Sequence, residues 1–495
     1  MKPYSFAVKV KGSSHESSGK PCQDYCLDWV SEDGLSQILV LSDGHGSDTY
    51  VRSHIGARFA CELTMGALKE LSNDTSVFQY FINQEGALTA TPWKDPLKSK
   101  NGARLKYADL GESQQEIVRQ NKAYVENFPK VKRQQTFLSG FFHDICNNWY
   151  SAINRDFEEN PLSEKEKALL GENNKEKAYG CTLLAYLRTP LFWLAFQIGD
   201  GKILICDRDL RWTEPVPWDC RCFLNLTTSL CDSSHPWDEF RFAFNGNGFF
   251  PIGVYLGSDG VDDSWGTPDK LKNFYSQVTQ ILVESDDLIK SQSELLEYLK
   301  ELSIKASHDD ISIASTLYLS ELVNGVHLYK LRRDGRNIQE QIVSLEKKLK
   351  ESSDNLSSPS IWESITAKYK QWLQSLHANL EGKDVSTEET LNEFLESSDQ
   401  LSKSTKEHQD LFLKVKDKIV ELKEKLEVLK QEHSKIEKEN RELSIIDIKK
   451  WRDTQDAFIQ YASREYTDNT QISAEFGKNQ TSESLIEELK NNENT

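Results

Sequence analysis

Short apolar stretches recur along the first two thirds of the chain. Phe6, Val8 and Val10 alternate with polar neighbours, and residues 38–41 form a compact apolar run. Such alternation and such short runs are typical of β-strands. Further strands are predicted at 181–187 and 191–198, which flank Thr189-Pro190 like the arms of a hairpin, at 202–206 and at 311–319. Many short strands indicate a core built from sheets.

Two longer stretches in the same part of the chain have the helical period. Residues 52–71 and 137–157 are amphipathic, and the second spaces four apolar side chains by four residues: Phe141, Ile145, Trp149 and Ile153. Ser163 and Glu166 have the spacing of a capping box, which predicts the start of a short extra helix. These helices are expected to cover the sheets.

The character of the chain changes after about residue 321, where Lys, Glu, Gln, Ser and Leu dominate. Four-three spacing of apolar residues predicts a helix through Ile338 and Ile342, a break at 352–359, a second helix, and a long third helix after the capping pair Ser386 and Glu389. His433 and Asn440 are polar members of the predicted seam of this third helix. We expect a helical hairpin of coiled-coil type.

These patterns predict a division into three parts. A sheet-built domain is expected at 1–320, with a polar surface insertion at about 73–134. The helical arm is expected at 321–467, and a polar, flexible tail at 468–495. The arm is expected either to fold on itself or to serve as a docking or dimerisation device.

Composition excludes several partners. The formal net charge of -18 and the pI near 5.2 disfavour binding to nucleic acid or to an anionic membrane, because such surfaces need a basic footprint. No apolar stretch is long enough to span a bilayer. All nine cysteines fall between Cys22 and Cys231, an odd number that suits reduced thiols and a cytoplasmic location. The cysteine pairs lack the matched spacing of a zinc site.

Five short stretches place an aspartate beside a glycine or at the end of a predicted strand. They are Gln23-Asp24, Asp43-Gly44-His45-Gly46, Gly199-Asp200-Gly201, Ser258-Asp259-Gly260 and His308-Asp309-Asp310. A single Asp-Gly is most often a turn. Three of these stretches adjoin strand-like runs, so their carboxylates are expected to converge at one edge of the sheet core. Converging carboxylates need cations to stay ionised, and oxygen ligands suit Mg²⁺ or Mn²⁺.

The order and wording of these stretches resemble the protein phosphatase 2C family, the metal-dependent protein phosphatases. The matching residues are Gln23-Asp24, Asp43 to Gly46, Gly180-Cys181-Thr182, Gly199-Asp200, Ser258-Asp259-Gly260 and Asp309-Asp310. The stretch 19–24 resembles a bacterial branch of the family. The resemblance covers about residues 4–320 and implies an α/β sandwich of two antiparallel sheets flanked by helices.

The resemblance also implies roles for single residues. Asp43 would bridge two Mn²⁺ or Mg²⁺ ions, with the carbonyl of Gly44 on one ion and Asp259 and Asp309 on the other. Asp24 would support the ligands from behind, and Gln23 would be a neutral ligand or hold a water. Asp200 would contribute to a third, weaker metal position. His45 matches the proposed general acid of the family.

The implied reaction is hydrolysis of phosphoserine or phosphothreonine on proteins by a hydroxide that bridges the two metal ions. One family feature is missing, because the arginine that usually grips the substrate phosphate is Gly19 here. Lys20, or His15, would have to replace it, and a lysine lacks the bidentate fork of an arginine. The expected setting is bacterial signalling or defence.

Two other functions stay open. The chain could be a scaffold or regulator that binds a phosphorylated partner without turning it over, with the arm as its working part. It could also act on a small phosphorylated metabolite. The retention of Asp43, Asp259 and Asp309 together argues against the scaffold, since clustered carboxylates are costly without metal chemistry.

Overall fold

The computed structural model describes residues 2–82, 87–90, 106, 108, 111, 115, 132–219, 222, 227–232, 235–356, 359–380 and 386–465. Most of the predicted insertion at 73–134 and the whole tail at 468–495 lie outside these residues. The chain forms two compact units: one from Met1–His327 and the chain from Lys438 onward, the other from Leu328–Glu437. Each unit is described by itself.

The first unit contains a sheet of five antiparallel strands in the order β1-β11-β10-β7-β8. These strands are β1 (Tyr4–Val10), β7 (Lys202–Cys206), β8 (Trp212–Thr213), β10 (Gly253–Gly257) and β11 (Ile311–Leu317). The first and last predicted strands of the domain pair directly, with Val8 opposite Ile313. This sheet therefore joins segments from both ends of the predicted domain.

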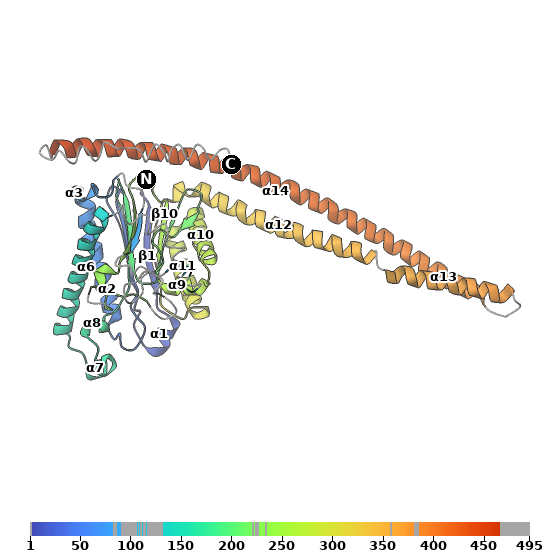
Figure 1. The fold of residues 1–495 in the computed structure, drawn as a ribbon, viewed down its shortest axis with the longest axis horizontal. Coiled ribbons are helices and arrows are strands. Elements are labelled where there is room, and N and C mark those ends of the chain that lie inside the picture. Colours follow the sequence, from blue (N-terminus) through green and yellow to red (C-terminus); the bar gives the residue numbers. More distant parts are fainter. Residues whose placement is uncertain are drawn as a thin grey trace. The chain divides into compact units, whose positions relative to one another are not determined.

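A second sheet has six antiparallel strands in the order β2-β3-β5-β6-β9-β4. They are β2 (Tyr25–Val30), β3 (Gln37–Ser42), β4 (Ala87–Ala90), β5 (Leu183–Arg188), β6 (Trp193–Ile198) and β9 (Arg241–Asn245). The predicted hairpin around Thr189-Pro190 is the β5–β6 pair. The two sheets stack face to face (Figure 1).

Strand β3 shows why one stretch of the sequence is apolar without interruption. Leu39 and Leu41 pack into the layer between the sheets, while Ile38 and Val40 belong to the core on the other face. Side chains alternate between the faces of a strand, so a strand buried on both faces needs apolar residues at every position. The run at 38–41 is such a strand, paired on one side with β2 and on the other with β5.

Helices cover both outer faces of the sandwich (Figure 1). On the six-stranded sheet lie α2 (Ser53–Asn73) and α6 (Lys132–Glu159), near the short α3 (Thr75–Phe78), α7 (Glu164–Leu170) and α8 (Lys175–Ala178). On the five-stranded sheet lie α9 (Asp259–Trp265), α10 (Pro268–Glu284) and α11 (Leu288–Lys305). Short segments complete the unit: α1 (Ser13–Ser18), η3 (Pro236–Asp238) and η4 (Leu319–Glu321).

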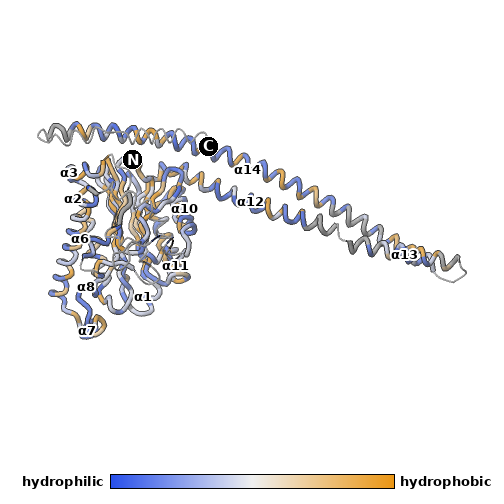
Figure 2. Tube along the Cα trace, in the orientation of Figure 1, coloured by the Kyte–Doolittle hydropathy of each residue, from blue (hydrophilic) through white to orange (hydrophobic). Residues whose placement is uncertain are grey.

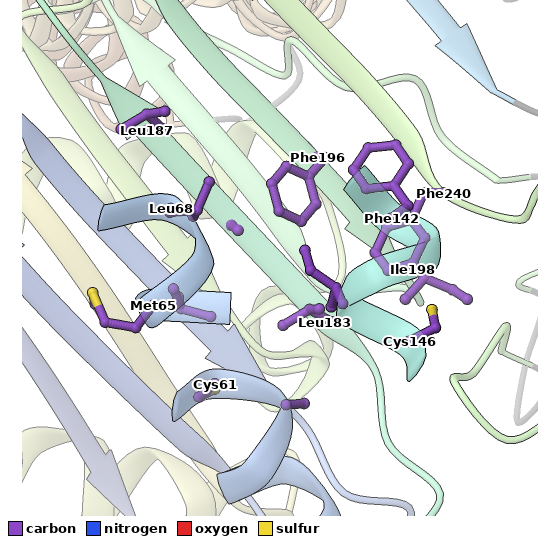
Figure 3. Packing of buried hydrophobic residues seen from close by; sticks show 14 of the residues in the cluster. Cys61, Met65, Leu68, Phe142, Cys146, Leu183, Leu187, Phe196, Ile198 and Phe240 are labelled. Atoms are coloured by element: carbon purple, nitrogen blue, oxygen red, sulfur yellow. The ribbon is translucent and has the colours of Figure 1, made fainter. Parts of the chain in front are cut away.

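The largest apolar cluster lies between the six-stranded sheet and its two long helices. Figure 3 shows residues of this cluster from α2 (Cys61, Met65 and Leu68), from α6 (Phe142 and Cys146) and from the strands (Leu183, Leu187, Phe196 and Ile198). The Phe142 ring stacks on Phe240 with centroids 4.6 Å apart. The apolar stripe predicted on α6 is therefore its buried face. The predicted capping box is also present, since Ser163 and Glu166 bond each other reciprocally.

The C-terminal helices are α12 (Val323–Leu356), α13 (Pro359–Leu380) and α14 (Thr387–Glu465). Within the second unit, the predicted seam is buried, with Ile342 of α12 packed against Ile419 and Leu422 of α14. Arg332 donates a hydrogen bond from Nε to Nε2 of His433 at 3.2 Å, which gives one polar seam residue a partner. Figure 2 shows apolar positions recurring along these mainly hydrophilic helices.

The last part of α14, from Lys438, belongs to the first unit and packs on its sandwich. Trp451 is only 4% exposed, and its Nε1 donates to the carbonyl of Leu191 at 3.0 Å. Gly248 faces this ring, and a Cβ there would lie 2.7 Å from it. Asn440 donates to the carbonyl of Arg208 and to Asp209 at 3.1 and 2.8 Å. The structure therefore assigns this segment to the first unit, whereas the sequence-based boundaries placed it in the arm.

The mixed α/β sandwich and the long C-terminal helix confirm the predicted fold class. None of the helices that the structure describes combines the length and the apolar character needed to cross a bilayer.

Replacing Trp451 with alanine should destabilise the first unit. The substitution leaves a cavity in the main apolar cluster and an unpaired Leu191 carbonyl, and such truncations cost about 3–5 kcal/mol. The free energy of unfolding, measured by chemical denaturation, gives the cost directly. Ile446→Ala on the same helix is the matched control, because that side chain is 45% exposed and should cost less than about 1 kcal/mol. Equal effects of the two variants would show that the α14 segment does not stabilise the unit.

Candidate metal centre and active site

Asp43 stands immediately after β3, an interior strand of the six-stranded sheet. Its backbone N–H donates to Thr182 Oγ1 at 3.0 Å, and its carbonyl accepts from the Thr182 N–H at 2.8 Å. Gly44 forms an isolated bridge with Cys181. A Cβ on Gly44 would lie 2.7 Å from the Gln23 carbonyl, so the close approach requires glycine here. The Gly180-Cys181-Thr182 stretch thus fixes the loop that carries Asp43.

Asp259 reaches the same place from the other sheet. It follows β10 and opens α9, and the preceding Ser258 exchanges hydrogen bonds with Ser312 of β11. The carboxyl groups of Asp43 and Asp259 are close enough to share a hydrogen bond. The structure therefore brings together two of the predicted ligands that lie far apart in the sequence.

Asp24 lies behind this pair and is almost completely buried. Its Oδ2 accepts a hydrogen bond from Ser312 at 2.7 Å, and its Oδ1 has no hydrogen-bond partner. The neighbouring Gln23 is also buried, and its Nε2 donates to the His45 carbonyl at 3.0 Å and to Ser53 Oγ at 2.5 Å. Gln23 Oε1 lacks a partner. Each residue thus keeps one buried acceptor oxygen unused.

Asp309 and Asp310 have different surroundings. The Asp309 side chain is about half exposed (51%), whereas Asp310 is 2% exposed. Asp310 accepts hydrogen bonds from the backbone N–H groups of Gly12 and Gln23 at 2.6 and 2.5 Å, and its Oδ2 lies 3.0 Å from His15 Nδ1. Although burial acts in the opposite direction, these bonds hold the pKa of Asp310 below its usual value. Asp310 therefore anchors the N-terminal loop beside Asp309.

The Asp200 loop is held by contacts that sequence reasoning did not find. Gly199 has a φ of +110°, a conformation that favours glycine, and its N–H donates to Thr228 Oγ1 at 3.0 Å. The fully buried Arg241 donates to the carbonyls of Gly199 and Pro217. Burial raises the pKa of Asp200, against the effect of a hydrogen bond with Thr227. The charge of Asp200 in turn raises the pKa of Asp259, so the two carboxylates act on each other.

Lys20 and His15, the two candidates for binding the substrate phosphate, already have partners within the protein. Lys20 donates to the Gly46 carbonyl at 2.7 Å and pairs with Asp48 at 2.7 Å, while His15 is buried against Asp310. Gly19 ends α1 with a φ of +71°, which favours glycine at the position of the missing arginine.

The carboxylates of this site resist ionisation. Burial, and then the charge of Asp310, raise the pKa of Asp24 to about 7. Burial, with Asp200 and Asp309 adding to it, raises the pKa of Asp259 to about 8. Burial and the charges of Asp24 and Asp259 raise the pKa of Asp43 well above its usual value. Without a cation, part of this cluster must hold protons at neutral pH.

The donor set fits Mg²⁺ or Mn²⁺. It consists of carboxylate and carbonyl oxygens, and two of the buried carboxylate oxygens, Asp24 Oδ1 and Asp259 Oδ1, are left without a hydrogen bond. Within the described residues, no three His, Cys, Asp or Glu side chains come together as a complete ligand set, so the Gly44 carbonyl and waters would have to complete the coordination. Mg²⁺ commonly keeps several waters and takes only one or two carboxylates, so a water-rich site is the arrangement that these residues suit.

Comparison with known proteins decides the family. The protein phosphatase 2C family model matches residues 11–300. This chain belongs to the protein phosphatase 2C family. Among curated proteins none matches the chain. Three similar solved structures are a bacterial serine phosphatase (11% identity, TM-score 0.36, covering 63% of this chain and 97% of that chain), Stp1 from Staphylococcus aureus (12%, 0.34, 64% and 95%), and PstP/Ppp from Mycobacterium tuberculosis (15%, 0.33, 64% and 98%).

In this phosphatase 2C member, His45 follows the candidate ligands directly. Its N–H donates to the Gly180 carbonyl at 3.1 Å, and its ring meets the edge of Tyr50 with centroids 4.6 Å apart. Burial lowers the pKa of His45 to about 4. The imidazole is therefore neutral at pH 7 before a substrate arrives.

The raised pKa values of this phosphatase 2C site predict how stability responds to pH without metal. Asp24 and Asp259 have folded-state pKa values near 7 and 8, above the value of about 3.9 for an unfolded aspartate. The folded state then holds protons that the unfolded state releases, so stability that is present at low pH is lost as the pH rises through 7 and 8. In EDTA, the free energy of unfolding should fall from about pH 4, where the aspartates of the unfolded chain ionise, to about pH 8, where those of the folded chain have ionised too.

Saturating Mn²⁺ should remove most of that fall, because the ions take the place of the protons. Asp259→Asn in EDTA should show a smaller fall than the wild type. Chemical denaturation at a series of pH values measures both effects. Metal-free stability that does not change between about pH 4 and 8 would contradict the description of the cluster.

Proposed function

We propose that this chain is a metal-dependent phosphatase for phosphoserine and phosphothreonine in proteins. The observation that carries the proposal is the contact between the Asp43 and Asp259 carboxyl groups, at the meeting of the two sheets. Its membership of the phosphatase 2C family gives the reaction class. Keeping such carboxylates together costs stability unless cations bind them, so their retention favours metal chemistry.

In this proposal each residue has a distinct task. Asp43, the Gly44 carbonyl, Asp259 and Asp309 would hold two divalent ions, and Asp200 would help to hold a third. Asp24 accepts from Ser312 and supports the ligands, while Gln23 orients the loop through the His45 carbonyl and keeps Oε1 for a water. Bound Mn²⁺ or Mg²⁺ would supply an activated water as nucleophile and neutralise the charge on the phosphoryl group.

His45 supplies the proton for the leaving oxygen. A serine or threonine alkoxide is a poor leaving group, so donation of a proton from a ring nitrogen lowers the barrier. The imidazole is neutral in the free protein, and the negative charge of a bound phosphate raises its pKa, because an opposite charge stabilises the imidazolium. The acid is thus formed by substrate binding.

Lys20 remains the proposed contact for the substrate phosphate. Its ammonium contacts the loop that carries His45, because it donates a hydrogen bond to the Gly46 carbonyl. Its ion-pair partner, Asp48, is exposed. Exposed ion pairs are worth at most about 1 kcal/mol, so a phosphate can compete for this lysine.

The part of the helical arm that forms the second unit, 328–437, is proposed for docking or self-association. Several apolar side chains of α14 in this unit are at least half exposed, namely Leu395, Leu411, Leu413, Val420 and Val428. The alternative function, a scaffold that binds a phosphorylated partner without turnover, is motivated by Gly19 at the arginine position and by the pairing of Lys20 with Asp48.

Asp259→Asn should abolish metal-dependent turnover. Loss of a metal ligand is expected to lower kcat/KM by at least about a hundredfold with a phosphothreonine peptide in Mn²⁺. Asp286→Asn, an exposed aspartate before α11, is the matched control and should keep wild-type activity. Wild-type protein that binds Mn²⁺ by calorimetry but turns over neither a peptide nor an aryl phosphate would favour the scaffold.

His45→Gln should separate substrates by their leaving groups. We expect kcat for a phosphothreonine peptide to fall by about a hundredfold or more, while p-nitrophenyl phosphate loses much less, since nitrophenolate leaves without a proton. His143→Gln, an exposed histidine on α6, is the control. Equal losses with both substrates would show that His45 orients the site and is not the acid.

A further inference from the structure

Three side chains form a polar group beside His45 that none of the roles above uses. The Tyr50 ring contacts the His45 ring, and the Lys177 ammonium lies 4.7 Å from the centroid of Tyr50. Lys177 Nζ also lies 3.4 Å from Asp232 Oδ1. We call Tyr50, Lys177 and Asp232 the flanking cluster. Its members come from the end of the Asp43 loop, from α8 and from the chain between β8 and η3.

The flanking cluster is held in place by the same backbone that holds the active site. The Gly180 N–H donates to the Lys177 carbonyl at 3.2 Å, and the Gly180 carbonyl accepts from the His45 N–H at 3.1 Å. A Cβ on Gly180 would lie 2.6 Å from the Tyr50 ring, so the ring packs directly on this glycine. Next to Asp232, the Leu230 N–H donates to the Cys181 carbonyl at 3.0 Å. Lys177 therefore has a fixed position relative to His45.

Lys177 is accessible and has donor capacity left. Its side chain is 29% exposed, and that of Asp232 is 37% exposed. An ammonium carries three N–H groups, and among the described residues Lys177 Nζ pairs with the Asp232 carboxylate and lies over the Tyr50 ring. One donor thus remains for a ligand, and the partial burial makes its charge count for more than on an open surface.

The position of the flanking cluster beside His45 determines which part of a substrate it can contact. A general acid must face the oxygen that leaves, and in a phosphorylated protein this oxygen is bonded to the side chain of the substrate residue itself. The polypeptide on either side of that residue must then pass close to His45.

We propose that Lys177, held by Tyr50 and Asp232, binds an acidic side chain next to the phosphorylated residue of a protein substrate. The inference rests on the proposed function and adds a sequence preference to it. An acidic flanking residue would otherwise be repelled by the net charge of -18 of the chain. Lys177 offsets this repulsion at the point where the flanking chain passes.

The test uses two phosphothreonine peptides of equal length, one with glutamates and one with lysines on both sides of the phosphothreonine. The quantity measured is the ratio of kcat/KM for the acidic peptide to that for the basic peptide, in the full chain with Mn²⁺. Because the ratio is taken within one variant, any general loss of activity cancels. The wild type should prefer the acidic peptide, and Lys177→Glu should lower the ratio roughly tenfold.

Two further variants give the comparison. Lys177→Arg keeps the charge and should keep the wild-type ratio. Lys167→Glu changes an exposed lysine of the neighbouring α7 that pairs with Glu164, and it should also keep the ratio. If Lys177→Glu and Lys167→Glu lower the ratio equally, the preference comes from overall charge and the inference is wrong.

The outcomes separate this inference from the proposed function. Wild-type turnover of p-nitrophenyl phosphate together with a ratio that Lys177→Glu leaves unchanged would contradict the role of Lys177 alone. A wild-type preference for the basic peptide would also contradict it. Absence of turnover with every substrate would contradict the proposed function and this inference with it.

Discussion

The contact between the carboxyl groups of Asp43 and Asp259 is the constraint on which the site depends. One residue follows β3, an interior strand of the six-stranded sheet, and the other follows β10 of the five-stranded sheet. Stacking of the sheets therefore brings the two carboxyl groups together. Burial raises the pKa of both groups, and the charge of Asp259 raises the pKa of Asp43 further. The fold holds this pair in place only when protons or cations balance it, which links the stability of the domain to metal binding.

The rest of the site keeps this pair in position. Gly44 and Gly260 allow close backbone contacts, since a Cβ at Gly260 would lie 2.1 Å from the Asp310 carbonyl. Asp310 ties the loop that carries Gln23 and Asp24 to the strand that follows Asp309. The Asp43 loop in turn rests on Gly180-Cys181-Thr182. Because each anchor is a backbone contact between distant segments, the candidate ligands and the flanking cluster share one rigid support.

Much of the fold and part of the site could be predicted from the sequence. The run at 38–41, the stripe on α6 and the capping box at Ser163 are local patterns, and local patterns determine their own elements. The aspartate stretches could also be recognised, because they occur in a fixed order and three of them adjoin predicted strands. The partnership of His15 with Asp310 could not be found in this way, because no local pattern relates residues from opposite ends of a domain.

Two other features could not be predicted from the sequence, each for a different physical reason. The spacing along α14 is the same before and after Lys438, although the first part packs on another helix and the second on the sandwich. Asn440 therefore resembled a polar seam residue, whereas it bonds Asp209 and the Arg208 carbonyl. Gly19 lacked an explanation until the structure gave it a left-handed conformation at the end of α1. A left-handed backbone conformation is visible in the sequence only as a glycine, and a glycine by itself does not reveal which conformation it adopts.

Proton release on metal binding is the most direct test of the central claim. Titration calorimetry with Mn²⁺ at pH 7, repeated in buffers of different ionisation enthalpy, gives the number of protons that leave the protein. With pKa values near 7 and 8 for Asp24 and Asp259, about one proton or more should be released as the ions bind. Absence of Mn²⁺ binding, or binding without proton release, would contradict the account of the carboxylate cluster as a metal centre.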